Sequence, residues 1–197
     1  MEFEKVVGVG IFAIKPDDTV LTIRELISKK TSQKKAGDRS ILMETVKKGE
    51  KLSDALIRLT QEEVSISGFG SWETCLNDEI CRVRFDRGVW LHIFRQMVPM
   101  EAEVILGSKG GKEVDNPLWE PLSILAKYTL DAIRPGVWAA IISHINHPYP
   151  TLDPDVYQNK IYTFPSEILV KLEYRVSSSL VSSQPVFPIQ QQSDYLV

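Results

Sequence analysis

Four charged residues between positions 50 and 63 have the types and the spacing for chemistry on a phosphate group. They are Glu50, Arg58, Glu62 and Glu63. Clustered carboxylate oxygens are the ligands that Mg²⁺ and Mn²⁺ prefer. Such cations neutralise the negative charge that otherwise repels a water nucleophile from a diphosphate. Without a metal, Arg58 and Glu62 stand four residues apart and form an ordinary ion pair, worth about 0.3 to 0.5 kcal/mol on an exposed helix.

A short helix is expected to position these side chains. The apolar residues that follow the i, i+3, i+4, i+7 spacing of one helix face are Leu52, Ala55, Leu56 and Leu59. Gly49, just ahead of them, allows the chain to turn sharply into the helix. The sequence therefore predicts a helix over 52–63 that buries one stripe and carries the charged residues beside it.

Taken from position 44, the same stretch resembles the Nudix box. That pattern is Gly, five residues, Glu, seven residues, Arg-Glu, an aliphatic, any residue, Glu-Glu, any residue, Gly and an aliphatic. The positions that match are Glu50, Arg58, Glu62, Glu63 and Ile66. The positions that depart are Glu44 for the first Gly, Leu59 for the Glu of Arg-Glu, Thr60 for an aliphatic and Ser65 for the closing Gly. The order of the expected elements over residues 5–147 is also similar to that of a Nudix domain.

This resemblance implies a Nudix-type α/β/α sandwich around a mixed β-sheet, in which the box forms a loop and a helix. It implies hydrolysis of a nucleoside-diphosphate derivative, with Mg²⁺ or Mn²⁺ as cofactor and a nucleotide-like small molecule as ligand. In these terms the metal ligands are Glu62, Glu63 and Glu50. The catalytic residues are Glu63, Glu62 and Arg58, of which Arg58 orients the carboxylates.

Leu59 stands where this interpretation needs a carboxylate. Positions i and i+4 of a helix share a face, so the pair that would share metal ions is here Leu59 and Glu63. Glu44, in the place of the first box Gly, is a candidate for returning the missing carboxylate, whereas Leu59 would join the apolar stripe. Two interpretations follow: a metal-dependent hydrolase, or a catalytically lapsed Nudix domain that senses a nucleotide-like ligand or interacts with a protein.

Strands and two further helices are expected around this helix. The predicted strands cover 5–14, 19–24, 80–85, 89–97 and 102–106, and the predicted helices cover 122–130 and 135–147. Residues 29–39 contain five lysines or arginines without apolar periodicity. They are predicted to form a solvated loop, with contact to ligand phosphates as the alternative. Residues 107–116 form a second predicted loop.

The amino-acid composition of the chain changes after Pro148. Residues 149–154 contain prolines and are typical of a linker, and residues 177–197 are rich in Ser, Gln and Pro. We therefore expect a Nudix-like domain over 1–150 and a C-terminal extension over 151–197 that is partly irregular. Residues 177–197 are predicted to be dispensable for folding.

Composition narrows the classes of partner. The chain has 197 residues, of which 43% are hydrophobic and 25% charged, enough for one domain with a complete core. A net charge of −3 gives no global basic field, so neither nucleic acid nor an anionic membrane is an expected partner. Cys75 and Cys81 lack the paired spacing of a zinc site, and two free thiols indicate a cytoplasmic protein. Formation of a homodimer is possible from the sequence.

Three other patterns are interpreted as structure. Gly8 and Gly10 imitate a dinucleotide-binding fingerprint, but they fall inside a predicted strand with no helix after it. His144 and His147 have helical spacing, yet next to Pro148 they are expected to cap carbonyls or to be solvated. Most of the four tryptophans are expected in the core.

Overall fold

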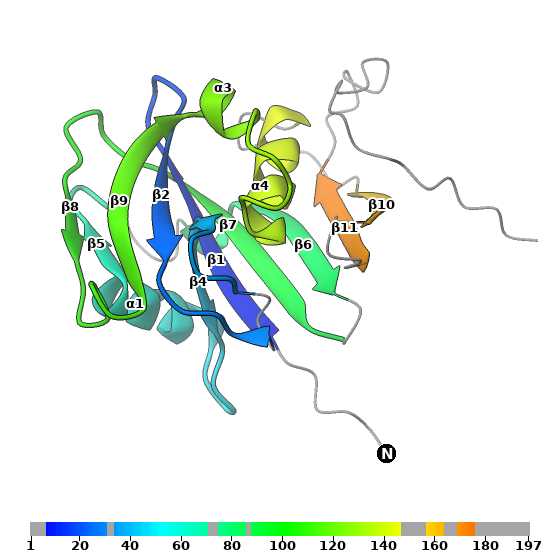
Figure 1. The fold of residues 1–197 in the computed structure, drawn as a ribbon, viewed down its shortest axis with the longest axis horizontal. Helices are drawn as coiled ribbons and strands as arrows, with labels where there is room; N and C mark the ends of the chain where they lie inside the picture. Colours follow the sequence, from blue (N-terminus) through cyan, green and yellow to red (C-terminus); the bar gives the residue numbers. More distant parts are fainter. Residues whose placement is uncertain are drawn as a thin grey trace, which may run out of the picture.

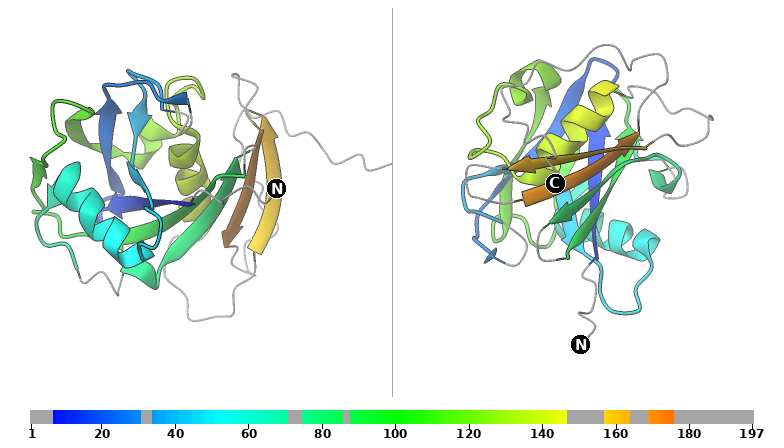
Figure 2. Two further views of the ribbon diagram at one scale, coloured as in Figure 1. Left: turned by 90° about the horizontal axis from the view of Figure 1, so that it is seen from below. Right: turned by 90° about the vertical axis from the view of Figure 1, so that its right-hand side faces the viewer.

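The computed structural model describes residues 7–30, 34–70, 75–85, 88–146, 157–163 and 169–175. A mixed β-sheet forms its centre and carries helices on both faces (Figures 1 and 2). The strands are β1 (Val7–Ile14), β2 (Thr19–Glu25), β3 (Arg39–Ser40), β4 (Leu42–Thr45), β5 (Val64–Ile66), β6 (Glu79–Phe85), β7 (Trp90–Met97), β8 (Val104–Leu106), β9 (Val114–Pro121), β10 (Tyr157–Thr163) and β11 (Leu169–Arg175). The helices are α1 (Leu52–Glu62), α3 (Leu122–Leu125) and α4 (Pro135–Asn146).

The main sheet contains nine of the described strands. Its order is β10-β11-β6-β7-β1-β2-β3, with β4 paired to β1 and β9 paired to β2. β1 runs parallel to β7 along its whole length, from Val7 opposite Trp90 to Ile14 opposite Met97, whereas the other pairs are antiparallel. β5 and β8 form a separate antiparallel pair. The predicted fold class, an α/β sandwich around a mixed sheet, is confirmed.

The two faces of the sheet have separate hydrophobic cores, as the alternation of side chains along β1 requires. Phe12 and Ile14 belong to the core beneath α4. Val9, Ile11 and Ala13 belong to the core beneath α1. The left panel of Figure 2 shows α1 and α4 on opposite sides of the strands. α1 is therefore fixed to the sheet by its apolar stripe, which leaves its charged residues beside the sheet edge.

Several predicted elements are confirmed within one or two residues. The β1–β2 hairpin, the β6–β7 pair and α1 lie where the periodicity indicates. α4 begins at Pro135, as predicted from the tolerance of proline in a first helical turn. Gly49 has a φ of +79°, the left-handed conformation that favours glycine in the turn before α1.

The prediction for residues 107–130 is wrong in two respects. Residues 114–121 form β9 and pair with β2, Leu21 lying opposite Trp119, whereas the sequence predicted a loop over 107–116 and no strand here. The helix predicted over 122–130 ends at Leu125. Glu120 is one reason why the strand was missed, because this charged residue occupies a buried position. Its carboxylate accepts hydrogen bonds from the hydroxyls of Thr22 and Tyr128.

The sheet also continues beyond residue 150. β11 pairs with β6, so that Leu172 lies opposite Val83, and Val170 and Leu172 are fully buried in the core beneath α4. A boundary at residue 150 therefore does not separate this hairpin from the sheet, because β6 offers its edge to β11. The proposed irregular tail at 177–197 lies outside the described residues.

The helices and the two cysteines relate to the predicted cellular location of the protein. In the described part of the chain, no helix is both long and apolar enough to cross a membrane. Cys75 and Cys81 are free and buried, and burial raises the pKa of each thiol to about 12.

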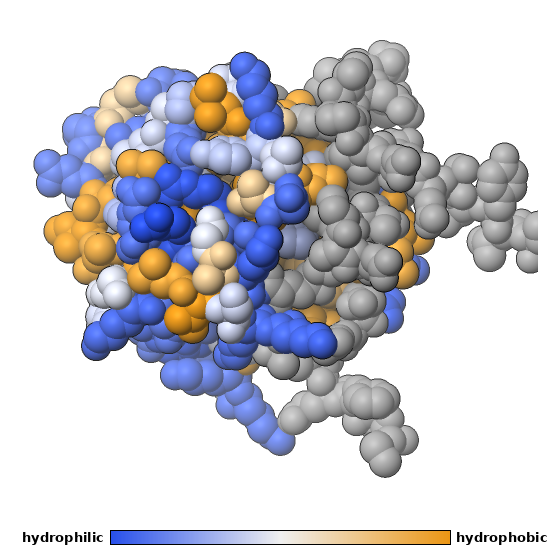
Figure 3. Space-filling view, viewed as in Figure 1, coloured by the Kyte–Doolittle hydropathy of each residue, from blue (hydrophilic) through white to orange (hydrophobic). Residues whose placement is uncertain are grey.

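Apolar side chains gather over β8 at the left edge of Figure 3, where Ile105 is 68% exposed.

Candidate functional site

The loop ahead of α1 is held by one ion pair. Arg58 donates hydrogen bonds from Nε and Nη2 to the two carboxylate oxygens of Glu50, both at 2.9 Å. The backbone N–H of Lys47 donates to the same carboxylate at 2.7 Å. The hydrogen bonds from Arg58 hold the pKa of Glu50 at about 2. Glu50 is therefore an ionised support of the loop, with both oxygens engaged.

Arg58 also gathers the other carboxylates of the box. Its Nη1 lies 3.2 Å from Glu44 and 3.7 Å from Glu62, and its Nη2 donates to the carbonyl of Thr45 at 2.8 Å. Its side chain is only 14% exposed. Arg58 is thus the centre of a partly buried cluster of carboxylates. The spacing alone suggests only an exposed ion pair with Glu62.

Lys109 is a second cation in this cluster. Its Nζ lies 2.9 Å from Glu44 and 2.7 Å from Glu62. Burial raises the pKa of Glu44, but the hydrogen bond from Lys109 and the charge of Arg58 outweigh it and hold that pKa below its usual value. Burial likewise opposes the charge of Lys109, and its two carboxylate partners raise its pKa despite this. Both groups are charged at neutral pH.

Leu59 belongs to the core and not to the site. Its side chain is fully buried with Ala55 and Leu56 beneath the sheet. Ser65, which stands for the closing box Gly, donates from its hydroxyl to the carbonyl of Thr60 at 3.0 Å. The apolar stripe has therefore absorbed the position where the box pattern places a carboxylate.

Glu63 is separate from the Arg58 cluster. It is 2% exposed, and its Oε2 has no hydrogen-bond partner among the described residues. Burial, reinforced by the nearby charge of Glu25, raises its pKa to about 8. Lys34 and Arg134 act in the opposite direction and do not offset these two effects. At neutral pH most of Glu63 is a neutral carboxylic acid.

A pocket of about 160 Å³ lies against Glu63. Its polar lining residues are Lys29, Lys30, Lys34, Glu44, Thr45, Glu63, Glu113 and Arg134. Its apolar lining residues are Ile27, Met43, Phe85, Val89 and Leu91, with Gly8 among them. A Cβ on Gly8 would lie 3.2 Å from Leu91, so this glycine of β1 allows close packing against Leu91.

The loop expected to be solvated instead contributes a buried cation to this pocket. The side chain of Lys34 is 8% exposed, and its Nζ lies 2.8 Å from Glu25. Arg134, at the start of α4, donates to the other oxygen of Glu25 at 2.8 Å. Glu25 is 1% exposed, and a buried carboxylate requires such partners. The interpretation of this loop as merely solvated is therefore wrong for Lys34, whereas Lys29 and Lys30 are exposed at the pocket rim.

Known structures with this arrangement of elements are numerous. The chain matches one from Jonesia denitrificans, described as a candidate asymmetric diadenosine tetraphosphate hydrolase, with a TM-score of 0.54, 13% identity, and 78% and 100% of the two chains covered. It matches the MutT protein of Methanosarcina mazei Go1 with a TM-score of 0.51, 17% identity, and coverage of 75% and 98%. It matches the E. coli ORF135 protein with a TM-score of 0.51, 14% identity, and coverage of 76% and 94%. The chain has the Nudix fold.

Sequence comparison adds nothing to this assignment. No protein-family model matches the chain, and no curated protein is significantly similar to it. At 13 to 17% identity, the Nudix fold is shared while the residues of the site have to be judged from their own geometry.

Within the Nudix fold, the predicted site residues divide into two groups. Glu50, Arg58 and Glu62 come together as predicted, and Glu44 joins them from β4. Glu63 lies apart, in the pocket. Sequence reasoning missed Lys109, Arg134 and Glu25. No local pattern marks these three residues, because each reaches the site from a distant element.

The residues as they are arranged do not fit the Mg²⁺ or Mn²⁺ site that the box pattern implies. Two of the predicted ligands, Glu50 and Glu62, are engaged by Arg58 and Lys109. The i, i+4 partner of Glu63 is the buried Leu59. Across the described ranges, no group of three or more His, Cys, Asp or Glu residues is arranged to hold a metal ion.

His144 differs from both earlier interpretations. It is 5% exposed, and its Nδ1 lies 3.2 Å from Nη1 of Arg95. Arg95 is itself buried and donates to Asp78 at 2.7 Å. His144 is therefore part of a buried polar network on the α4 side of the sheet, and not a solvated cap. His147 lies outside the described residues.

Proposed function

We propose that this Nudix-fold protein binds a phosphate-bearing, nucleotide-like ligand in the Glu63 pocket, and that it binds this ligand without a divalent cation. In this proposal the domain is catalytically lapsed and acts as a ligand sensor. The observation that carries the proposal is the engagement of Glu44, Glu50 and Glu62 by Arg58 and Lys109. Carboxylates paired with internal cations are not available to a metal unless those pairs break.

The charge of the pocket favours an anionic ligand. Lys29 and Lys30 stand exposed at the rim, and Lys34 and Arg134 line the wall. Because Glu63 is mostly neutral below its pKa of about 8, it does not repel a phosphate at pH 7. A neutral carboxyl group also has an O–H that can donate a hydrogen bond to a phosphate oxygen or to a base. Clustered Lys and Arg are the usual partners of phosphate in proteins.

The size and apolar wall of the pocket favour a nucleotide-like ligand over free phosphate. A cavity of about 150 Å³ holds one small aromatic ring, and this pocket has about 160 Å³. Phe85, Val89 and Leu91 are among its apolar lining residues, against which a planar base can pack. The rest of such a ligand would extend past Lys29 and Lys30 toward solvent.

The structural comparisons support the ligand class. The Jonesia denitrificans chain is described as a candidate asymmetric diadenosine tetraphosphate hydrolase, and the substrate in that description carries a phosphate chain between nucleosides. We infer that the present chain takes ligands of the same broad class, nucleotides with two or more phosphates. Base and leaving group are left open.

A second candidate is an Mg²⁺- or Mn²⁺-dependent hydrolase of a nucleoside-diphosphate derivative. The unpartnered Oε2 of buried Glu63 favours it, because such an oxygen is the kind of group that a cation satisfies. Glu62, Glu63 and Glu50 would hold the metal, and Arg58 would orient them. The cation would supply charge neutralisation at the phosphate. This candidate requires Lys109 to leave Glu62.

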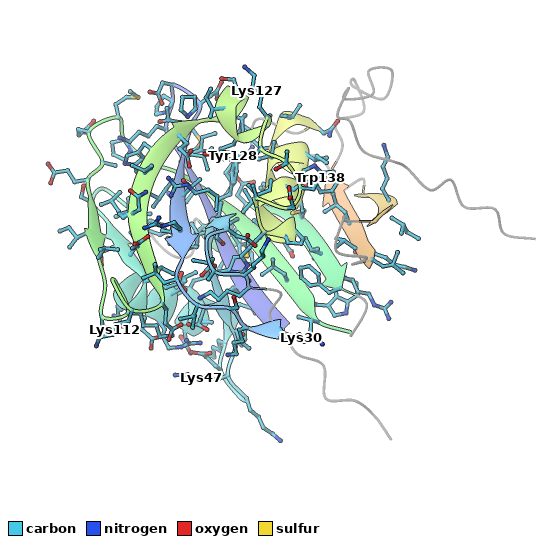
Figure 4. The ribbon with its side chains drawn as sticks, viewed as in Figure 1. Lys30, Lys47, Lys112, Lys127, Tyr128 and Trp138 are labelled. Carbon is cyan, nitrogen blue, oxygen red and sulfur yellow. The ribbon has the colours of Figure 1, made fainter. Side chains whose placement is uncertain are left out.

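A ligand titration with matched lysine variants tests the location of the site. ADP-ribose and ATP are titrated calorimetrically into the full chain and into Lys30→Ala and Lys127→Ala. Lys30 lies in the lower half of Figure 4 and lines the pocket, and exposed Lys127 lies at the top. We expect Lys30→Ala to weaken binding about three- to tenfold, roughly 1 kcal/mol, and Lys127→Ala to have no effect. Equal effects, or no binding, would overturn the proposal, and nucleotide products appearing with Mn²⁺ would favour the hydrolase.

Two expectations of the sequence remain proposals. We propose that the protein acts in a reducing cytoplasm, which the two buried free thiols support. A homodimer is the other, and the exposed Ile105 on β8 is where we would expect such a contact. Size-exclusion chromatography with light scattering on the wild type and Ile105→Lys measures it.

A further inference from the structure

Lys109 occupies the position between two carboxylates that a bridging cation would take. One oxygen each of Glu44 and Glu62 contacts the same ammonium nitrogen, at 2.9 and 2.7 Å. Arg58 contacts the same two oxygens from its Nη1 at 3.2 and 3.7 Å. Carboxylates brought together in this way would repel each other strongly without a positive charge between them. The side chain of Lys109 therefore performs the charge neutralisation that a metal performs in a carboxylate site.

The backbone of the Lys109 loop is fixed to the end of α1. The N–H groups of Gly107, Ser108 and Lys109 donate to the carbonyls of Glu63, Gln61 and Glu62, at 2.7, 3.3 and 2.6 Å. These carbonyls belong to the last turn of the helix and its cap, which no intrahelical hydrogen bond satisfies. The loop thus caps the helix that carries the carboxylates.

Gly107 makes this close approach possible. A Cβ at this position would lie 2.5 Å from the carbonyl oxygen of Gln61 and 2.7 Å from that of Glu62, too close for any other residue without a shift of backbone. The root of the Lys109 side chain is consequently held against α1 by backbone contacts. Its ammonium is preorganised at the carboxylates and does not need to be recruited from solvent.

Two carboxylates surround the ammonium. Glu44 from β4 and Glu62 from α1 each contact the nitrogen of Lys109 through one oxygen. Mg²⁺ usually keeps several waters and is bound through one or two carboxylates, so this pair is a ligand set that it accepts. Glu63, in the neighbouring pocket, is not part of this set.

We propose that Lys109 is a built-in substitute for a divalent cation, and that its ammonium closes a latent cation site formed by Glu44 and Glu62. The inference deepens the proposed function, because it explains how Glu44, which lines the pocket, is neutralised without metal. It does not depend on the identity of the ligand, since the cation site is tested with metal alone. Removing the charge of Lys109 is expected to open the site.

The test is a titration of the full chain with Mn²⁺ alone, followed by calorimetry and by the shift in melting temperature. Lys109→Met keeps most of the aliphatic stem and the backbone N–H, and removes the ammonium. The matched control is Lys112→Met, since Lys112 is exposed on the same loop and lies at the lower left edge of Figure 4. We expect Mn²⁺ to bind Lys109→Met at least tenfold more tightly than it binds the wild type or Lys112→Met.

Two further variants secure the interpretation. Lys109→Arg retains a cation and is expected to exclude Mn²⁺ as the wild type does, and adding Glu62→Gln to Lys109→Met is expected to abolish the gained binding. Equal Mn²⁺ affinity of wild type and Lys109→Met would overturn the proposal. If Lys109→Met does not fold, Lys109→Gln replaces it in the same titration. The proposal would also be overturned if millimolar Mn²⁺ raised the melting temperature of the wild type. Failure of ADP-ribose to bind would count against the proposed function alone.

Discussion

The two ends of α1 differ in what has become of the box. Ahead of the N-terminal end, Glu50 matches the pattern and forms a two-bond ion pair with Arg58 that ties the loop to the helix. At the C-terminal end, Leu59 is buried in the core and Lys109 neutralises Glu62. The first end supports the fold, and the second end is where the implied metal chemistry would take place.

The difference shows that the charged residues of one motif can have separate structural roles. The Glu50–Arg58 pair supports the loop whether or not a metal is present. Glu62 matches the motif, but its partners are Lys109 and Arg58 and not the metal that the motif implies. A match to a motif therefore indicates the fold more firmly than the activity.

Replacing Leu59 by Glu should have the largest effect. The change restores the i, i+4 spacing to Glu63, but it places a carboxylate among Ala55 and Leu56 in the core. We expect a loss of roughly 4 kcal/mol or more in the free energy of unfolding, measured with urea. Mn²⁺ should not restore this loss.

Leu59→Met serves as the control, because it keeps the apolar volume and should change stability by less than about 1.5 kcal/mol. A stable Leu59→Glu variant that binds Mn²⁺ would contradict the difference between the two ends, since it would show that the C-terminal end lacks only one ligand.

Removing Arg58 should have the next largest effect. Arg58→Met leaves Glu50 without its bidentate partner and takes one cation from Glu44 and Glu62. We expect a loss of roughly 2 to 3 kcal/mol in the free energy of unfolding. Lys51→Met, an exposed change just before α1, should lie within about 0.5 kcal/mol of the wild type. Equal stabilities of the two variants would show that the pair does not support the loop.

Glu63 should make stability depend on pH. Its folded pKa of about 8 lies above its ordinary value of 4.5, so the folded state binds more protons between these limits. Its contribution therefore weakens stability as pH rises from about 4.5 to 8. Glu63→Gln should remove this decline and be more stable than the wild type at pH 9, by a few kcal/mol. Urea titrations of both proteins from pH 5 to 9 measure the difference, and a difference that does not change with pH would refute the raised pKa.

Removing residues 177–197 should have the smallest effect. Their composition predicts no contribution to folding, so we expect the melting temperature to change by less than about 2 °C. Removing the chain from residue 157 onward should lower it much more, because Val170 and Leu172 are fully buried against the sheet. A large effect of the shorter truncation would indicate that the tail packs on the domain.

Local patterns predicted the elements whose side chains follow one period. The stripe of α1 and the dense apolar residues of β1 are examples, and both lie where expected. β9 was missed because its sequence, VDNPLWEP, contains two prolines and no apolar alternation, and because Thr22, which donates to its buried Glu120, is distant in sequence. β4, which brings Glu44 to the site, is only four residues long.

The site was predictable only as far as the motif extends. Glu50 and Arg58 pair as their spacing within the box suggests, whereas Lys109 reaches Glu44 across 65 positions of sequence. The burial of Lys34 beside Glu25 likewise depends on how the loop folds back on β2. Contacts of this kind depend on tertiary packing, so no window of sequence contains them.

One measurement tests the central claim most directly. ADP-ribose is titrated calorimetrically into the wild-type chain, once in excess EDTA and once with Mg²⁺, and the solutions are then assayed for AMP. The account predicts dissociation constants within about threefold of each other, since 1.4 kcal/mol would already be tenfold, and no AMP. Binding that requires Mg²⁺, accompanied by AMP, would contradict it and would establish the metal-dependent hydrolase instead.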